Sequence, residues 1–172
     1  MKNFITLTLT LLLLVPELIA GNLGLAPGFP LYGAVCLAVA FGEVYGVAAA
    51  GLSAMILDII YDRPYPFWTV SAVLILYIAA GTVKRVQRKQ PVSALSAGAV
   101  CGILIALYNI FLPFFTNGDL PGPNPFALLI FHISGGMFFM SILVLIFDAV
   151  NLRSDLPRFG IYGSHSDIRG RR

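Results

Sequence analysis

The sequence predicts an all-α integral membrane protein, a bundle of six transmembrane helices. Of its 172 residues, 58% are apolar and only 11% are charged, whereas charged residues make up about 25% of an ordinary soluble domain. A soluble domain of this length has too little interior to bury so much apolar surface, so the excess must face lipid. The composition therefore argues against a soluble enzyme, a nucleic-acid-binding domain and a disordered chain.

Apolar stretches mark where the chain crosses the membrane. A helix rises about 1.5 Å per residue and needs about 20 apolar residues to cross a core about 30 Å thick. Single crossings are predicted at residues 4–20, 67–83, 92–115 and 125–150. The remaining stretch, residues 31–61, is too long for one helix and short for two.

The distribution of basic residues decides how residues 31–61 cross. Ten of the eleven basic residues fall into three groups: Lys2; Lys84, Arg85, Arg88 and Lys89; and Arg153, Arg158, Arg169, Arg171 and Arg172. The eleventh, Arg63, is the only cation of the segments predicted to lie outside. If the stretch turns between Gly42 and Gly46 and crosses as 31–42 and 44–61, all three groups lie in the cytoplasm, as the positive-inside rule requires. A single crossing would place the last two groups outside. We therefore predict six spans and two cytoplasmic termini.

This topology divides the chain into a membrane domain, residues 1–152, and a cytoplasmic tail, residues 153–172, whose glycines and mixed charge predict disorder. Pro16 and Glu17 lie near the outer end of the first span, where the charge can reach the interface. The first span also fits a secretory signal peptide, but Leu18 stands where a small residue is preferred before cleavage, which favours an uncleaved anchor.

Two spans carry stripes of small residues at four-residue spacing, and each stripe follows one helix face. In the third span the stripe is Gly46, Ala50 and Ala54, which Asp58 continues at the same spacing and which Gly51, three residues before Ala54, widens. In the fifth span it is Ala94, Gly98, Gly102 and Ala106. Small residues allow a second helix to approach closely. That helix belongs either to the same bundle or to a partner protein, and the sequence leaves both alternatives open.

Four of the polar residues within or beside the spans are candidate functional groups. Asp58 is either a buried functional carboxylate or an interfacial group that pairs with Arg63. Glu43 is expected at the amino terminus of a helix beside the cytoplasmic turn, where the helix dipole favours a negative charge. Asn109 is expected to bond across helices, and His132 to be a hydrogen-bonded packing residue.

The sequence contains no motif that predicts catalysis or a cofactor. It has no nucleophile elbow, phosphate-binding loop or dinucleotide fingerprint, and no cysteine and histidine share a metal-ligand spacing. Cys36 and Cys101 both lie in apolar runs and do not predict a disulfide framework. We expect a protein that is not an enzyme and binds no metal, cofactor or nucleic acid, and whose basic clusters contact anionic lipid.

Over residues 1–152, the order of these features resembles the family of the bacterial rod shape-determining protein MreD. The family's Gly-Leu-x-x-Asp run corresponds to Ala54-Met55-Ile56-Leu57-Asp58, in which the aspartate matches and Ala54 replaces the glycine. The family's Leu-Gly after the following loop is Phe67-Trp68 here, which is a departure.

The resemblance implies a non-catalytic scaffold subunit of the cell-wall elongation machinery in the bacterial inner membrane. Its partners would be a single-span MreC-like protein and, through it, the enzymes that synthesise peptidoglycan. The family is also similar in fold to the substrate-binding subunits of energy-coupling-factor vitamin transporters. Such a subunit is the alternative function, with Tyr65, Trp68, Asn109, Asn117 and His132 as candidate ligand contacts.

Overall fold

The computed structural model describes residues 2–22, 27–62, 65–86, 90–117, 124–153, 156 and 159. These residues form helices and no strand, which confirms the all-helical prediction. The six helices are α1 (Lys2–Asn22), α2 (Phe29–Ala40), α3 (Glu43–Ile60), α4 (Phe67–Val86), α5 (Gln90–Asn117) and α6 (Pro125–Arg153).

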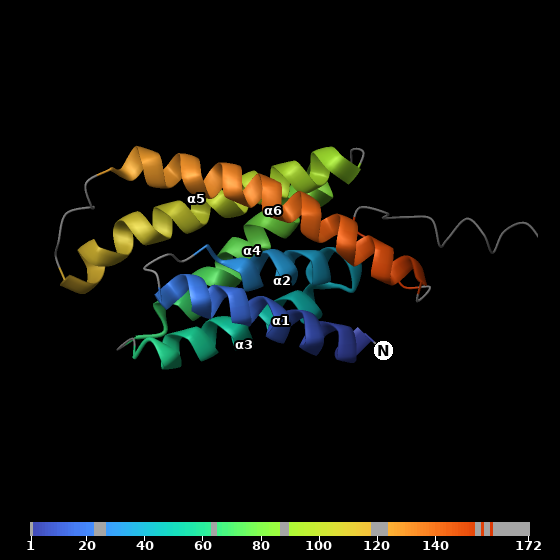
Figure 1. Cartoon of the computed structure of the whole chain (residues 1–172), viewed down its shortest axis with the longest axis horizontal. Coiled ribbons are helices and arrows are strands. Elements are labelled where there is room, and N and C mark those ends of the chain that lie inside the picture. Colours follow the sequence, from blue (N-terminus) through green and yellow to red (C-terminus); the bar gives the residue numbers. More distant parts are fainter. Residues whose placement is uncertain are drawn as a thin grey trace, which may run out of the picture.

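Consecutive helices run in alternating directions along the long axis of the molecule (Figure 1). The pair α5 and α6 lies on one side, α1 and α3 lie on the other, and α2 and α4 run between them. The start of α1, the turn between α2 and α3, and the last residues of α4 and α6 all lie at one end of the bundle. We call this the basic end, because Lys2, Lys84, Arg85 and Arg153 belong to it.

Four helices contain segments long and apolar enough to cross a membrane. These segments are Lys2–Gly21, Glu43–Ile60, Val92–Phe111 and Pro125–Leu152. The apolar parts of the other two helices, Phe29–Ala40 and Phe67–Val83, are shorter. The protein is therefore a membrane protein by the length and composition of its helices.

The shortest helix, α2, forms the centre of the bundle. It contacts each of the other five helices, and every residue from Pro30 to Val39 is buried. It is apolar on all sides, as expected of a helix enclosed by other helices. With 12 residues it is only about 18 Å long, which is shorter than a hydrocarbon core about 30 Å thick.

The long apolar tract of residues 31–61 turns at Phe41 and Gly42, beside the predicted position. Gly42 has a φ of +112°, a conformation that glycine adopts without the steric cost other residues incur. Glu43 is the first residue of α3 and lies in its first turn, where a negative charge interacts favourably with the helix dipole.

The structure describes two residues of the predicted tail beyond Arg153, Leu156 and Phe159. The backbone N–H of Leu156 donates to the carbonyl of Asn151 at 3.0 Å, and the Phe159 side chain is completely buried. Of the residues after α6, the two that the structure describes, Leu156 and Phe159, therefore lie against the bundle. Residues 160–172, for which disorder was also predicted, lie outside the described residues.

Candidate functional site

The clearest polar site in the described part of the chain surrounds Glu17 of α1. Its side chain is only 3% exposed. The backbone N–H of Gly28 donates to Oε1 at 3.2 Å, and the N–H of Phe29 donates to Oε2 at 2.7 Å. Glu17 therefore caps the amino terminus of α2 from the neighbouring helix. The expectation that its charge reaches the interface is wrong, because α2 begins inside the bundle and its first backbone N–H groups bind both carboxylate oxygens there.

The first turn of α2 leaves few backbone donors to satisfy. The four N–H groups that open a helix have no partner within it. Here Glu17 accepts two donors, Pro30 has no N–H, and the N–H of Leu31 donates to the Gly28 carbonyl at 3.0 Å. Gly28, the N-cap residue, has a φ of +76°, which presents its N–H to the carboxylate at little conformational cost.

Asp58 performs the same task for α4. Its side chain is 6% exposed, and its Oδ2 accepts the Thr69 N–H at 2.9 Å and the Thr69 Oγ1–H at 2.7 Å. Of the two alternatives for Asp58, a buried position is therefore the one found. Arg63, the partner of the interfacial alternative, lies outside the described residues.

A third carboxylate holds the segment that follows α6. Asp148 Oδ1 accepts the backbone N–H of Phe159 at 2.7 Å. In all three cases a carboxylate near the end of a helix binds a backbone N–H 11 residues further along the chain. We call Glu17, Asp58 and Asp148 the linking acids, because each joins its helix to a residue beyond the end of that helix.

Sequence reasoning did not assign this role to any of the three. For Glu17 the sequence did contain a signal. Gly28-Phe29-Pro30 begins 11 residues after it, and a glycine followed by a proline, which has no N–H, is typical of a helix start.

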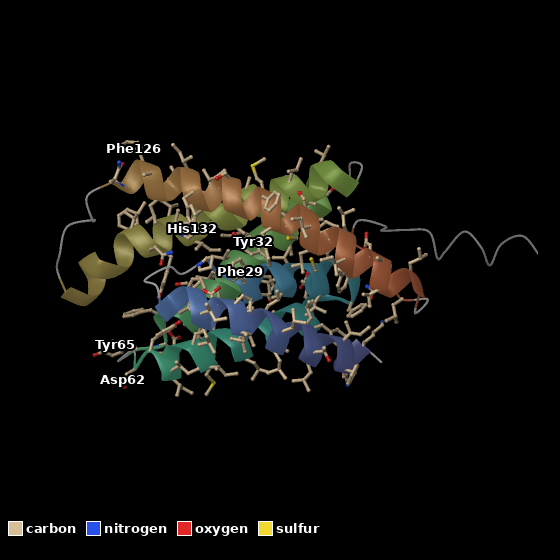
Figure 2. All side chains as sticks on the ribbon, in the orientation of Figure 1. Phe29, Tyr32, Asp62, Tyr65, Phe126 and His132 are labelled. Atoms are coloured by element: carbon tan, nitrogen blue, oxygen red, sulfur yellow. The ribbon has the colours of Figure 1, made fainter. Side chains whose placement is uncertain are left out.

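The polar pair Asn109 and His132 joins α5 to α6. Asn109 Nδ2 lies 3.4 Å from His132 Nε2, and the His132 side chain is 4% exposed. Figure 2 shows His132 on the ribbon of α6 beside α5. These positions fit the expectation that both residues bond across helices within the bundle.

The small-residue stripe of α5 packs inside the chain. A Cβ at Gly98 would meet the backbone of Gly136 and Met137, and one at Gly102 would meet the backbone of His132 and Ile133. Ala94 at the start of the stripe is buried as well. The stripe therefore allows the backbones of α5 and α6 to approach closely, and a partner's helix cannot occupy the same face.

The stripe of α3 also lies largely inside. Gly46 packs against Ala34 and Ala38 of α2. Ala50 and Ala54 are buried and line a small interior space that Trp68 of α4 also lines. Of the two alternatives for this stripe, packing within the same bundle is therefore the one found for these three residues.

Gly51 is different from the rest of that stripe. A Cβ at Gly51 would meet no described atom of this chain within 4 Å. It is the member of the α3 stripe that remains open to a second protein.

The described residues that were candidates for binding a vitamin take part in three separate contacts. The Trp68 ring is buried with its centroid 4.7 Å from that of Tyr108. Tyr65 is exposed and its ring lies 5.5 Å from that of Phe67. Among the described candidates, only Asn109 and His132 are brought together by a polar contact, and the side chain of Asn117 lies outside the described residues.

Within the described part of the chain, no three His, Cys, Asp or Glu residues are grouped so that they could hold a metal ion. The described fold and contacts define a helical membrane-protein bundle whose linking acids tie successive segments together. The chain matches no family model, and no curated protein and no solved structure matches it.

Proposed function

We propose that the chain is a six-pass protein of the bacterial inner membrane with both termini in the cytoplasm. It serves there as a non-catalytic scaffold of the cell-wall elongation machinery, as the resemblance to the MreD family implies, and binds a single-span MreC-like partner. The observation that carries the topology is the gathering of Lys2, Lys84, Arg85 and Arg153 at one end of the bundle.

Basic residues are retained on the cytoplasmic side of inner-membrane proteins. With the helices alternating in direction, six crossings bring every member of this group to that side. At the opposite end, Asp62 is the charged residue of the described connection between α3 and α4. The charge asymmetry thus supports the same orientation for every helix.

The short helix α2 is compatible with this topology because the rest of the bundle encloses it. A helix of about 18 Å exposes no side to lipid when five helices surround it. Its amino terminus lies within the hydrocarbon thickness, where a backbone N–H without an acceptor is costly. Glu17 supplies that acceptor from inside the protein.

Reporter fusions test the topology. A reporter that is active in the cytoplasm is expected to work when fused after Lys89, and one that is active in the periplasm is expected to work when fused after Asp62. Fusion after Asp62 also serves as the control for expression of the truncated chains. Periplasmic activity of the Lys89 fusion would contradict the six-pass arrangement.

The scaffold role is supported by the use of the described polar groups. Glu17, Asp58 and Asp148 bind backbone N–H groups of the same chain, and Asn109 contacts His132. The outward faces of the long helices are apolar. This distribution favours a rigid body that presents apolar faces to lipid and to other membrane proteins.

Copurification tests the partner. The full chain, coexpressed with a single-span MreC-like protein, is expected to form a stable complex in mild detergent. Gly51→Leu is expected to weaken that complex without loss of folding, because the added side chain projects from α3 into open space. Gly81→Leu on α4 is the matched control, since a Cβ there also meets no described atom within 4 Å.

If the chain purifies without the MreC-like protein although both proteins are present in the membrane, the scaffold proposal is contradicted. Thermal stabilisation of the purified chain by thiamine, biotin or riboflavin would favour the transporter subunit instead.

A further inference from the structure

An apolar groove runs between α1 and α6 on the surface of the bundle. Its volume is about 470 Å³. The α1 wall extends from Phe4 to Pro16 and the α6 wall from Phe139 to Val150, and Thr8 contributes the one polar side chain among the lining residues. α1 packs on α2 and α3, whereas α6 packs on α5 and α2. The groove therefore lies where the two sides of the bundle separate.

The length of the groove matches one leaflet of a bilayer. Residues 4–16 of α1 and 139–150 of α6 each cover about 17–18 Å along the helix axis, against about 15 Å for half of the hydrocarbon core. Both walls begin at the basic end. The α6 wall stops near the middle of its helix, and the α1 wall stops at Pro16, about two thirds of the way along α1. At the inner end of the groove, the ring of Phe29 packs against the ring of Phe139, with 4.6 Å between the ring centroids. A transmembrane helix would need a groove of the full thickness, so an acyl chain fits this shape better.

A positive charge lies at the open end of the groove. Lys2 Nζ is 5.7 Å from the centroid of the Phe41 ring. The centroid of that ring is 5.7 Å from the ring centroid of Phe147, which lines the groove. Arg153 follows Val150 by less than one turn on α6. The nearby acid Asp148, whose Oδ1 accepts the Phe159 N–H, keeps its negative charge, and these two basic residues outnumber it. The charge at this mouth therefore complements a phosphate group.

We propose that the groove binds an acyl chain of an anionic phospholipid of the cytoplasmic leaflet, with the lipid phosphate beside Lys2. The cytoplasmic leaflet of biological membranes carries the anionic lipids that attract basic groups near the surface. The leaflet assignment rests on the topology proposed above, whereas the lipid site itself does not depend on a protein partner.

Lipid titration of the full chain in detergent, followed by native mass spectrometry, tests the site. The two probes are phosphatidylglycerol and phosphatidylcholine with identical acyl chains. The wild-type chain is expected to bind phosphatidylglycerol about fivefold more tightly, the effect of one cation at the lipid surface. Lys2→Gln is expected to remove this preference while the chain still binds either lipid.

Neighbouring residues of α6 provide a matched pair for the groove. Ile146 lines it and is 57% exposed, whereas Leu145 is 68% exposed and is not among its lining residues. Ile146→Trp is expected to weaken phosphatidylglycerol binding at least tenfold, and Leu145→Trp to leave it unchanged. Both side chains are largely exposed, so the folded state tolerates either replacement, which circular dichroism checks.

Equal affinity of the wild-type chain for the two lipids would overturn the charge assignment. Equal binding by the two tryptophan variants would overturn the groove. Loss of a copurifying membrane protein from Ile146→Trp, with lipid binding intact, would assign the groove to a protein helix instead. These measurements use solubilised protein, so their failure is distinguishable from a failure of the topology, which the reporter fusions report.

Discussion

Glu17→Leu is expected to lower the free energy of unfolding by about 2–6 kcal/mol, because two N–H groups inside the bundle lose their acceptor at about 1–3 kcal/mol each. The donors are those of Gly28 and Phe29 at the start of α2. Glu17→Gln is expected to have an intermediate effect, since an amide offers one acceptor oxygen in place of two.

The two cysteines make this measurement direct. Cys36 and Cys101 are both free and fully buried, so a thiol-reactive fluorescent dye reports unfolding in detergent as the temperature rises. The control is Glu43→Gln, which removes an exposed carboxylate from the first turn of α3. That change is expected to cost at most about 1 kcal/mol. A melting temperature of Glu17→Leu equal to that of the wild type would show that the buried cap contributes nothing.

Gly136→Ala is expected to destabilise the bundle by about 1–3 kcal/mol, the usual cost of forcing an added methyl group into a packed interior. A Cβ at Gly136 would lie 2.6 Å from the Gly98 carbonyl oxygen and 2.7 Å from the Tyr32 hydroxyl. The first of these atoms belongs to the backbone of α5 and cannot move without separating the two helices.

Gly135→Ala is the matched control for this change. Gly135 is the preceding residue of α6, and a Cβ there would meet no described atom within 4 Å. Replacing an open helical glycine with alanine is expected to stabilise the helix by about 0.5–1 kcal/mol. The two variants should therefore shift the thiol-dye melting curve in opposite directions. If both shift it equally, the close approach of α5 and α6 is not a determinant of stability.

The sequence was sufficient to predict the number and type of the helices. The lengths of the apolar stretches locate the helices. The positions of the basic residues require residues 31–61 to form two helices, and in the structure the turn between these helices lies at Phe41 and Gly42. Apolar length and loop charge are both properties of position along the chain, so they predict the helices without any knowledge of which helices are neighbours.

The contacts of the small and acidic residues could not be predicted in this way. Spacing shows that Gly98 and Gly102 share a face, but it does not show which helix covers that face. For Glu17, the outcome depends on where α2 begins, and apolar composition does not define that boundary because residues on both sides of it are apolar. Burial of a carboxylate is favourable only when its acceptors are used, and the donors come from a helix that the sequence does not position.

The recessed start of α2 bears on how the protein enters the membrane. A twelve-residue segment whose leading amide groups need a carboxylate from the preceding helix is a poor candidate for release into lipid by itself. Its delivery as a hairpin together with α1 brings the required oxygen atoms along at the same moment. Biogenesis would then begin with this two-helix unit, around which the remaining helices assemble.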